Sequence, residues 1–264
     1  MENIIYQKTR DIKESSYSLP KEIQDFNSLN LEEIHKYFLE KKHELKFLFK
    51  INLLDSILQE AIYHYDILEI NDKREQVYQT TYFDTHDLDT YHDHHNGKSN
   101  RYKIRKRYYT STKDSYWEIK IKKGQDKIKK RILTGKSIDD PDVSGFINKY
   151  TPYMSQNLFP KLFNQYNRIT LASKCCLERV TIDYHLVFPD PGGKDTEINH
   201  IAIAEIKKEH QMNHSFFYEI LKKHRVRPIK ISKYCIGLTL LNQIIKTNRF
   251  KSIVLNLNKL KDNF

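Results

Sequence analysis

Basic residues crowd between positions 101 and 131 of this 264-residue chain. The stretch holds thirteen Lys or Arg and three Asp or Glu, so its formal charge of +10 nearly equals the +11 of the whole chain. Arg101, Lys103, Arg105 and Arg107 stand at every second position, which places their side chains on one face of a β-strand. Such a row suits phosphate binding, because Arg can hold two phosphate oxygens through parallel hydrogen bonds. We therefore expect an anion site here.

The same alternation returns twice further along the chain. Residues 116–122 place their charged members on one face and their apolar members on the other: Glu118, Lys120 and Lys122 against Trp117, Ile119 and Ile121. Residues 127–132 repeat the pattern, and polar turn residues at 110–115 and 124–126 separate the three runs. This arrangement predicts a three-stranded antiparallel meander with one apolar face and one cationic face.

The simpler alternative for the cationic face is the solvated side of an amphipathic sheet. Same-face neighbours on a strand lie roughly 7 Å apart, and like charges at that distance repel by about 2 kcal/mol at an effective dielectric constant of about 20. A repulsion repeated along three strands favours a surface that is meant to receive a polyanion. We therefore prefer an anion site to a solvated face.

The remaining elements are read from periodicity and turn residues. Glu44 and Lys46 share one face of a strand at 43–49, and Glu205 and Lys207 share one face of a nearly apolar strand at 201–207. Further strands are expected at 77–84, 158–172 and 177–188. Helices are expected at 31–42, at 53–64 with Asn52 as its cap, and at 142–150, 216–224, 232–247 and 250–260.

These elements favour an α+β fold in which an antiparallel β-barrel is surrounded by peripheral helices. Charged residues recur on one face of nearly every strand, and an inward charged face is tolerable only if water or a charged ligand fills the lumen. We therefore expect a closed barrel with a polar tunnel. The expected division is a lead-in and helix at 1–42, the barrel domain at 43–247 and a tail at 248–264.

Composition excludes several classes of protein. The first residues do not resemble a signal peptide and no apolar run is long enough to span a membrane, so we expect a soluble cytoplasmic protein. The three cysteines suit reduced thiols rather than a disulfide framework or a zinc site. The histidines between His86 and His95 lie among aspartates and could bind a transition metal, but we favour a polar loop with short helical character.

The ordered motifs of the chain resemble the polyphosphate polymerase (VTC) domain, a member of the triphosphate tunnel metalloenzyme (CYTH-like) superfamily. The pieces that carry the resemblance span about residues 43 to 240 and lie at 82–85, 101–108, 118–120, 129–131, 166–168, 178–183, 205–207 and 232–234. The resemblance implies a basic tunnel in which the γ-phosphate of ATP is transferred to a phosphate or to the end of a growing polyphosphate.

The resemblance also implies roles for individual residues. Glu205 would take part in binding a divalent Mn²⁺ or Mg²⁺ ion. Phosphates would be held by Lys46, Arg105, Arg107, Lys120, Arg131, Arg168, Arg179 and Lys233. The catalytic candidates are Arg105, Arg107, Lys120, Arg168, Arg179 and Glu205. The charge pattern adds Arg101, Lys103, Lys122, Lys129 and Lys207 as phosphate-binding candidates.

The chain departs from the family pattern in three places. The first strand carries Glu44-x-Lys46 instead of the Glu-x-Glu-x-Lys of hydrolase relatives, which disfavours plain triphosphate hydrolysis. Ile169-Thr170 replaces the Ala-Phe that usually follows the Arg168 motif. From this sequence we expect no phosphate-sensing SPX domain before the barrel and no transmembrane helices after it. Any export of polymer would then need a separate membrane partner.

Three other functions remain open beside the polymerase. A metal-dependent triphosphate or tripolyphosphate hydrolase would use the same cations, and so would a polyphosphate-binding module without turnover. Nucleic-acid binding on an open basic sheet is less favoured. Its stacking rings would be Tyr102, Tyr108 and Trp117, and these alternate away from the Arg row, whereas single-strand binders place rings and cations on one surface.

Overall fold

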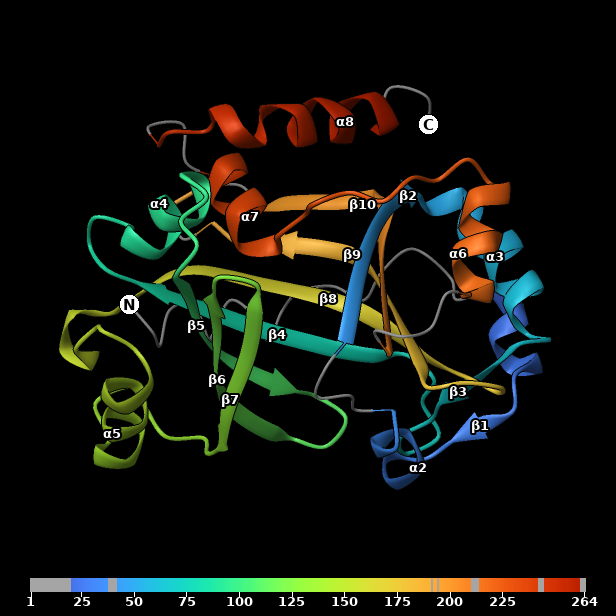
Figure 1. Ribbon diagram of the computed structural model, residues 1–264, viewed down its shortest axis with the longest axis horizontal. Helices are drawn as coiled ribbons and strands as arrows, with labels where there is room; N and C mark the ends of the chain where they lie inside the picture. The colour runs from blue at the N-terminus through green and yellow to red at the C-terminus, as the bar shows by residue number, and fades with distance from the viewer. Residues whose placement is uncertain are drawn as a thin grey trace.

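The computed structural model describes residues 20–37, 42–190, 192–193, 195–209, 214–241 and 245–261. A ten-stranded, mostly antiparallel sheet forms the body of the molecule (Figure 1). Eight strands follow one path, in the order β2-β10-β9-β8-β4-β5-β6-β7, and β1 and β3 lie off it. The strands are β1 (Ser28–Leu29), β2 (Lys42–Lys50), β3 (Tyr65–Leu68), β4 (Gln76–Asp84), β5 (Arg101–Tyr109), β6 (Asp114–Lys123), β7 (Asp126–Leu133), β8 (Phe159–Ser173), β9 (Glu178–Phe188) and β10 (Thr196–Glu209).

Seven α-helices are described around the sheet: α2 (Leu31–His35), α3 (Leu54–Ala61), α4 (Asp89–His95), α5 (Pro141–Tyr150), α6 (Phe216–Lys223), α7 (Lys233–Leu241) and α8 (Lys251–Lys261). The α+β class and the antiparallel sheet are thus confirmed, as is the meander at β5, β6 and β7. The sequence predicted Asn52 as the cap of α3, and this prediction is wrong. Asn52 lies inside a short 3-10 turn (Ile51–Leu53), and Leu53 precedes α3 without a side-chain cap.

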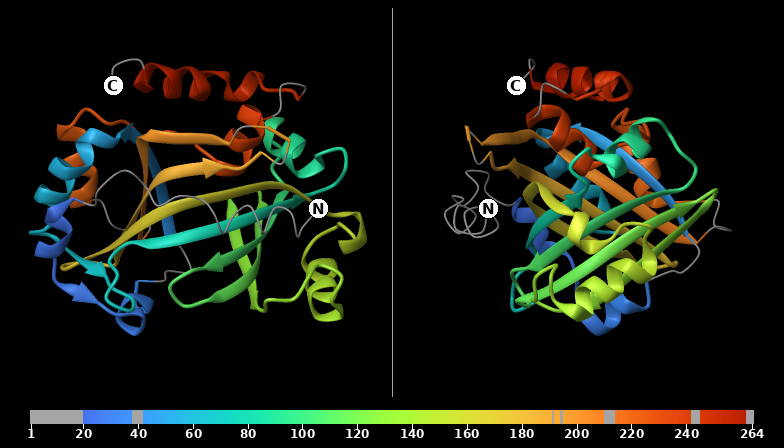
Figure 2. Two further views of the ribbon diagram at one scale, coloured as in Figure 1. Left: turned by 180° about the vertical axis from the view of Figure 1, so that it is seen from behind. Right: turned by 90° about the vertical axis from the view of Figure 1, so that its left-hand side faces the viewer.

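The sheet is strongly curved but does not close into a hydrogen-bonded barrel. Across the described ranges, β2 and β7 end the strand path and do not pair with each other. The free edge of β2 instead meets the segment after α6, where the Ile229 N–H donates to the carbonyl of Lys46 at 2.7 Å. The curvature still brings β6 toward β2 and β10. Lys120 of β6 lies close enough to Lys46 of β2 and to Glu205 and Lys207 of β10 for their charges to affect its pKa. The curved sheet therefore has an inner face, with a seam where β2 and β7 do not pair, and Figure 2 shows its curvature from two further sides.

Helices cover the apolar outer face of the sheet. Ile57 and Leu58 of α3 and Phe217 of α6 pack in one core cluster with Val180 and Ile182 of β9, and all five are completely buried. A second cluster joins α5 to the meander through Trp117 and Ile119. Because apolar and charged residues alternate along each strand, burying the apolar face outward turns the charged face inward.

Helix α7 departs from the expectation that every helix lies outside the sheet. It sits against the inner face at one end of the tunnel, in a core cluster with Tyr82, Leu162 and Ile203 (Figure 1). The helix can occupy this position because most of its residues are apolar, and residues 234–238 are all buried there. A Cβ at Gly237 would lie 2.6 Å from Phe188, which means that only glycine allows this close approach.

A bulge in β9 helps to build the inner face. The pairing of β9 shifts register on both sides next to His185, whose φ is 50°. One extra residue resets the alternation of the strand, as β-bulges do. Asp183 faces the inner surface before the bulge, and Leu186 and Phe188 join the cluster around α7 after it.

Candidate functional site

Strand register gathers the predicted basic residues on the inner face of the sheet. Cross-strand partners in a ladder point to the same side, so the pairing of Glu205 with Lys46 and of Lys207 with Glu44 and Arg179 places them together. The pairs Arg168–Asp183 and Arg105–Glu118 extend the same surface. The structure thus brings together ten cations: Lys46, Lys103, Arg105, Arg107, Lys120, Lys129, Arg168, Arg179, Lys207 and Lys233.

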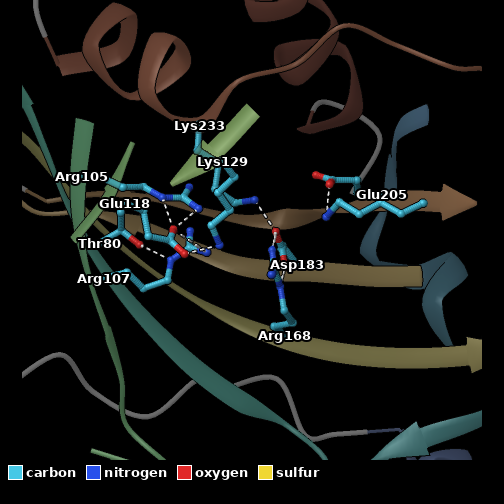
Figure 3. A network of polar contacts seen from close by, with 10 residues as sticks. Thr80, Arg105, Arg107, Glu118, Lys129, Arg168, Asp183, Glu205 and Lys233 are labelled. Atoms are coloured by element: carbon cyan, nitrogen blue, oxygen red, sulfur yellow. Dashed lines mark hydrogen bonds and ion pairs between the residues drawn. The ribbon is translucent and has the colours of Figure 1, made fainter. Parts of the chain in front are cut away.

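Glu118 lies at the centre of the first charge cluster, on β6 (Figure 3). Its carboxylate is completely buried, accepts a hydrogen bond from Arg105 Nε at 2.7 Å and forms ion pairs with Arg107 at 3.9 Å and with Lys129. Burial alone would raise the pKa of Glu118, but the three cations outweigh it and hold the pKa well below its usual range. Glu118 therefore remains ionised and fixes the two arginines. The sequence placed it on the right face but did not predict this role.

Asp183 organises the second cluster. Arg168 donates from Nε and Nη2 to the two carboxylate oxygens at 2.5 and 2.7 Å, and Lys233 at the start of α7 donates to the same carboxylate. Burial opposes ionisation of Asp183, yet these two cations lower its pKa. Lys233 also lies over the Tyr166 ring at 4.5 Å from its centroid. The expected approach of Lys233 to the tunnel is therefore seen in the structure.

The third cluster contains the predicted metal ligand. Lys46 Nζ lies 3.1 Å from Glu44 and 3.4 Å from Glu205, and Lys207 also pairs with Glu205. Burial would lower the pKa of Lys46, but the two carboxylates outweigh it and raise the pKa. Burial would likewise raise the pKa of Glu205, which Lys207, Lys46 and Lys120 together hold well below its usual range. Two carboxylates thus converge on one cation.

The carboxylates of this cluster fit a hard divalent cation. Glu44 and Glu205 already hold a positive charge between them, and Mg²⁺ in phosphate sites commonly takes one or two carboxylates and completes its shell with water and substrate phosphates. In the part of the chain that the structure describes, no three His, Cys, Asp or Glu residues form a metal-holding group. Substrate oxygens would therefore be needed to complete the coordination.

The inner face has more cations than carboxylates. Beside the ten cations stand four carboxylates, Glu44, Glu118, Asp183 and Glu205. Burial, with a further contribution from neighbouring cations, lowers the pKa of Lys103, Lys129 and Lys207 to about 8, while Glu118 and Glu205 oppose the shift at Lys129 and Lys207. Burial, followed by the charge of Arg105, lowers the pKa of Lys120 well below its usual range. A surface that lowers the pKa of its own lysines would be stabilised by a bound polyanion.

Lys103 links the tunnel to α7 and α4. Its ammonium donates to Ser232 Oγ at 2.9 Å and lies 3.4 Å from His94 Nε2. Arg101 lies nearer the end of the tunnel and donates to the carbonyl of Lys98 at 2.7 Å. Lys122 is only partly buried. These three predicted residues therefore extend the basic surface toward the end that α7 closes.

Arg131 is the predicted residue that the structure places least favourably. It lies on the inner-facing side of β7, opposite Glu118, but is exposed on the edge strand and stacks over the Tyr116 ring at 4.9 Å. In contrast, Arg107 and Arg168 are held over Tyr78 and Tyr166 deep in the tunnel, at 4.7 to 5.9 Å from the ring centroids. Tyr78 is flanked by Val77 and Gln79 and Tyr166 by Gln165 and Asn167, so the local sequence gave no sign that these rings would orient arginines.

Asp84 was part of a recognised motif, but its role is visible only in three dimensions. Its completely buried carboxylate accepts hydrogen bonds from Thr90 N at 2.9 Å, Thr90 Oγ1 at 2.7 Å and Tyr91 N at 3.0 Å, and also from the Tyr234 hydroxyl. Tyr234 follows Lys233 in α7. Asp84 therefore ties α4 and α7 together and holds the turn from which Lys233 enters the tunnel.

The positions of the histidines and of Trp117 bear on two alternatives, a transition-metal site at residues 86–95 and nucleic-acid binding. The histidines at 86–95 point in different directions: His86 stacks on Phe159, His94 approaches Lys103, and His95 packs against Phe250. Trp117 is completely buried under α5 and cannot stack on a nucleic-acid base. In the described ranges, no helix is long and apolar enough to cross a membrane.

Comparison with known proteins agrees with this architecture. A candidate adenylate cyclase from Bacillus halodurans superposes with a TM-score of 0.50 at 12% identity, covering 74% of this chain and 95% of that one. A candidate adenylyl cyclase from Hippeastrum, described as having a dominant triphosphatase activity, reaches a TM-score of 0.45 at 11% identity, covering 74% and 94%. No curated protein matches the sequence.

The sequence itself matches a protein family along most of its length. The description of that family is VTC domain, and the match runs over residues 41–242. It includes all the inner-face cations and carboxylates described above. The chain therefore belongs to the VTC domain family, and it shares its fold with the Bacillus halodurans structure.

Proposed function

We propose that the protein is an ATP-dependent polyphosphate polymerase that works inside the basic tunnel. In this reaction the bond between the β,γ-bridging oxygen and the γ-phosphorus of ATP breaks, and ADP leaves with that oxygen. A new P–O bond forms to an oxygen of inorganic phosphate or of a polyphosphate end. The observation that supports this most is the excess of six inner-face cations, with three lysines whose pKa is lowered to about 8.

The inner-face residues divide into groups with different tasks. Phosphoryl transfer needs positioning and charge neutralisation more than covalent help. Arg105 and Arg107, fixed by Glu118, would hold the transferred phosphate, and Arg168 and Lys233, fixed by Asp183, would orient the neighbouring one. Because the carboxylates set the directions of these cations in advance, little reorganisation is needed when the substrate enters.

The other predicted residues complete the proposal. Phosphates near Glu205 would be neutralised by Lys120, Arg179 and Lys207. A polyphosphate chain that runs toward α7 would contact Lys103, Arg101 and Lys122. Lys46 and Lys129 would exchange a carboxylate for phosphate when substrate binds. Glu205 and Glu44 would hold the Mn²⁺ or Mg²⁺ ion, whose charge neutralises phosphate oxygens and supports departure of ADP.

One incubation tests the proposal against its alternatives. The purified protein is given ATP with Mn²⁺ or Mg²⁺, polymer length is measured on a gel, and free phosphate is assayed in parallel. We expect long polyphosphate and ADP. The matched controls are Arg107→Gln, which should abolish synthesis, and Lys149→Gln, which removes an exposed lysine of α5 and should leave it unchanged.

The other outcomes assign different functions. Free phosphate without polymer would mean a triphosphate hydrolase, which the pair Glu44 and Glu205 could equally support by holding the ion. Tight binding of tripolyphosphate without any turnover would mean a binding module. Binding of single-stranded DNA with an affinity similar to that of tripolyphosphate would contradict a substrate-selective tunnel.

A further inference from the structure

A groove of about 440 Å³ lies outside the tunnel, where α8 passes over the end of β2 and the segment 224–229. Its apolar lining includes Leu53, Val226, Ile229 and Leu260. The segment that forms one wall is anchored to β2, because the Ile229 N–H donates to the Lys46 carbonyl at 2.7 Å. The volume is within the range of sites that hold a ligand or a few side chains. Figure 1 shows α8 crossing above β10 and β2 at this place.

The charged residues that line the groove are all basic, and one of them, His224, pairs with Glu60 at 2.9 Å. Lys50, His224, Arg225 and Arg227 line it, and none of its lining residues, all of them in the described part of the chain, is Asp or Glu. Arg225 and Arg227 are exposed, and no ion pair joins either to another described residue. A groove with an apolar floor and an arginine rim is complementary to a ligand that is apolar on one side and anionic on the other.

The surrounding sequence strengthens this charge bias. Residues 220–261 contain eleven Lys or Arg and no Asp or Glu. Only one of these cations, Lys233, enters the tunnel clusters. Of the others, Lys222 and Lys223 pair with Glu219 and Glu60. Burial lowers the pKa of Arg101, and Arg249 lies close enough for its charge to lower that pKa further. The charge bias of the groove therefore rests on its own lining residues, above all Arg225 and Arg227.

Arg225 occupies a backbone position that normally favours glycine. Its φ is 58°, directly after α6, where its N–H donates to the Lys222 carbonyl and the Val226 N–H donates to the Leu221 carbonyl. This is the pairing of a Schellman motif, whose left-handed residue is usually Gly. An L-residue with a Cβ costs roughly 1–2 kcal/mol there. Arg225→Gly should therefore keep the end of the helix intact, which makes it a suitable substitution for testing the arginine side chain.

We propose that this groove binds an acidic amphipathic peptide segment of a partner protein. The carboxylates of the segment would pair with Arg225 and Arg227, and its apolar side chains would enter between Leu53, Val226 and Leu260. The concave form favours a peptide over a bilayer, because a flat membrane surface would touch α8 and the rim without reaching the floor. The apolar floor disfavours a free phosphate.

The test uses a fluorescein-labelled twelve-residue peptide with Leu at helical spacing and Glu elsewhere, together with matched peptides in which every Glu is Gln or Lys. Affinities are measured by anisotropy with saturating tripolyphosphate, which occupies the tunnel. We expect the Glu peptide to bind at least tenfold more tightly than the other two. Arg225→Gly with Arg227→Ala should weaken it at least tenfold without lowering the melting temperature. The control Lys36→Gln with Lys149→Gln removes the same charge elsewhere and should leave affinity unchanged.

Several results would overturn the proposal. These are no binding of the Glu peptide, equal affinity for the double variant and the parent protein, and loss of peptide binding on adding tripolyphosphate, which would place the peptide in the tunnel. Phosphatidylserine vesicles form a further arm. If they bind the parent and not the double variant, while the peptide binds neither, the surface recognises a membrane and the peptide proposal is wrong.

Discussion

Glu118, Asp183 and Glu205 are each surrounded by cations that they hold in place. A buried carboxylate in such a cluster stays ionised because the loss of hydration is offset by several neighbouring positive charges. In a tunnel built for phosphates, these carboxylates orient the arginines and lysines before substrate arrives. Removing one of these carboxylates leaves several cations without their shared partner, whereas removing one cation leaves the carboxylate with its other partners.

Glu205→Gln should abolish metal-dependent turnover and lower the melting temperature in the absence of ligand. Lys46 and Lys207 then face each other without their shared carboxylate, and removing one partner of a buried ion pair costs up to about 3–5 kcal/mol. Because the pair is partly hydrated, we expect a decrease of about 4–10 °C. Scanning fluorimetry and an ATP assay with Mn²⁺ measure both effects. Unchanged turnover would show that Glu205 does not serve the metal.

The lowered pKa values of the inner lysines predict opposite effects of pH on binding and stability. The pKa of Lys103, Lys129 and Lys207 is about 8 in the folded protein, against an ordinary value of 10.5. Tripolyphosphate affinity should therefore fall about tenfold between pH 7 and 9.5, as charge-assisted contacts are lost. Between pH 8 and 10.5 the unfolded chain binds more protons than the folded one, so these groups add stability as pH rises.

Lys103→Arg is the matched variant for this pH dependence. Arginine stays protonated throughout the range, so the decrease in affinity should become shallower while binding at pH 7 is kept. Calorimetry with tripolyphosphate at constant ionic strength measures the slope. An identical slope in the variant and the parent would mean that Lys103 does not contact the ligand.

At the scale of elements, α7 decides how the tunnel ends. It packs against the inner face because most of its residues are apolar and Gly237 allows close contact with Phe188 of β9. Asp84 also accepts a hydrogen bond from the Tyr234 hydroxyl. The same helix carries Lys233 toward Asp183. Asp84 therefore affects the position of Lys233 in the binding site, because Tyr234, which it binds, is the next residue of the same helix.

Tyr234→Phe should weaken tripolyphosphate binding about three- to tenfold, with a stability loss of about 1–2 kcal/mol for the missing hydrogen bond. The expected reason is a shift of the first turn of α7 that displaces Lys233. Tyr91→Phe is the control, because the Tyr91 hydroxyl donates to the Lys246 carbonyl in the same layer without touching Asp84. It should lose similar stability and keep its affinity. Equal affinities for all three proteins would contradict a positioning role for Tyr234.

The whole molecule combines an incompletely closed sheet with an uncompensated positive interior. Repulsion among the inner cations opposes the curvature that brings β6 toward β2 and β10. A bound polyanion would remove that repulsion and join the two sides through shared phosphate contacts. Stability and ligand binding should therefore be strongly linked.

Tripolyphosphate at about one hundred times its dissociation constant should stabilise the protein by about 2.7 kcal/mol, which raises the melting temperature by roughly 5–10 °C. Added NaCl should reduce the shift, because salt screens the contacts that remain open to solvent. Sulfate at equal ionic strength is the control, since a single tetrahedral anion cannot join the opposite walls. Equal shifts with sulfate and tripolyphosphate would contradict a tunnel that spans several phosphates.

The sequence alone determined the meander, its charged face and the helices that follow the strands. These features depend on local rules: a period of two sets the face of each residue, and short polar turns force neighbouring strands to pair. The ordered motifs added the family and the tunnel. Strand periodicity and the family motifs together placed five residues on the inner face: Arg105, Arg107, Lys120, Glu205 and Lys233.

Only the tertiary structure decided which groups meet across the tunnel. The use of Glu118 as an anchor for arginines, the ties from Asp84 to α7 and the open seam between β2 and β7 all join residues far apart in the chain. Periodicity cannot show such contacts, because the distance between two walls depends on the curvature of the sheet. That curvature depends in turn on packing against the helices and on a bulge at His185, neither of which leaves a local pattern in the sequence.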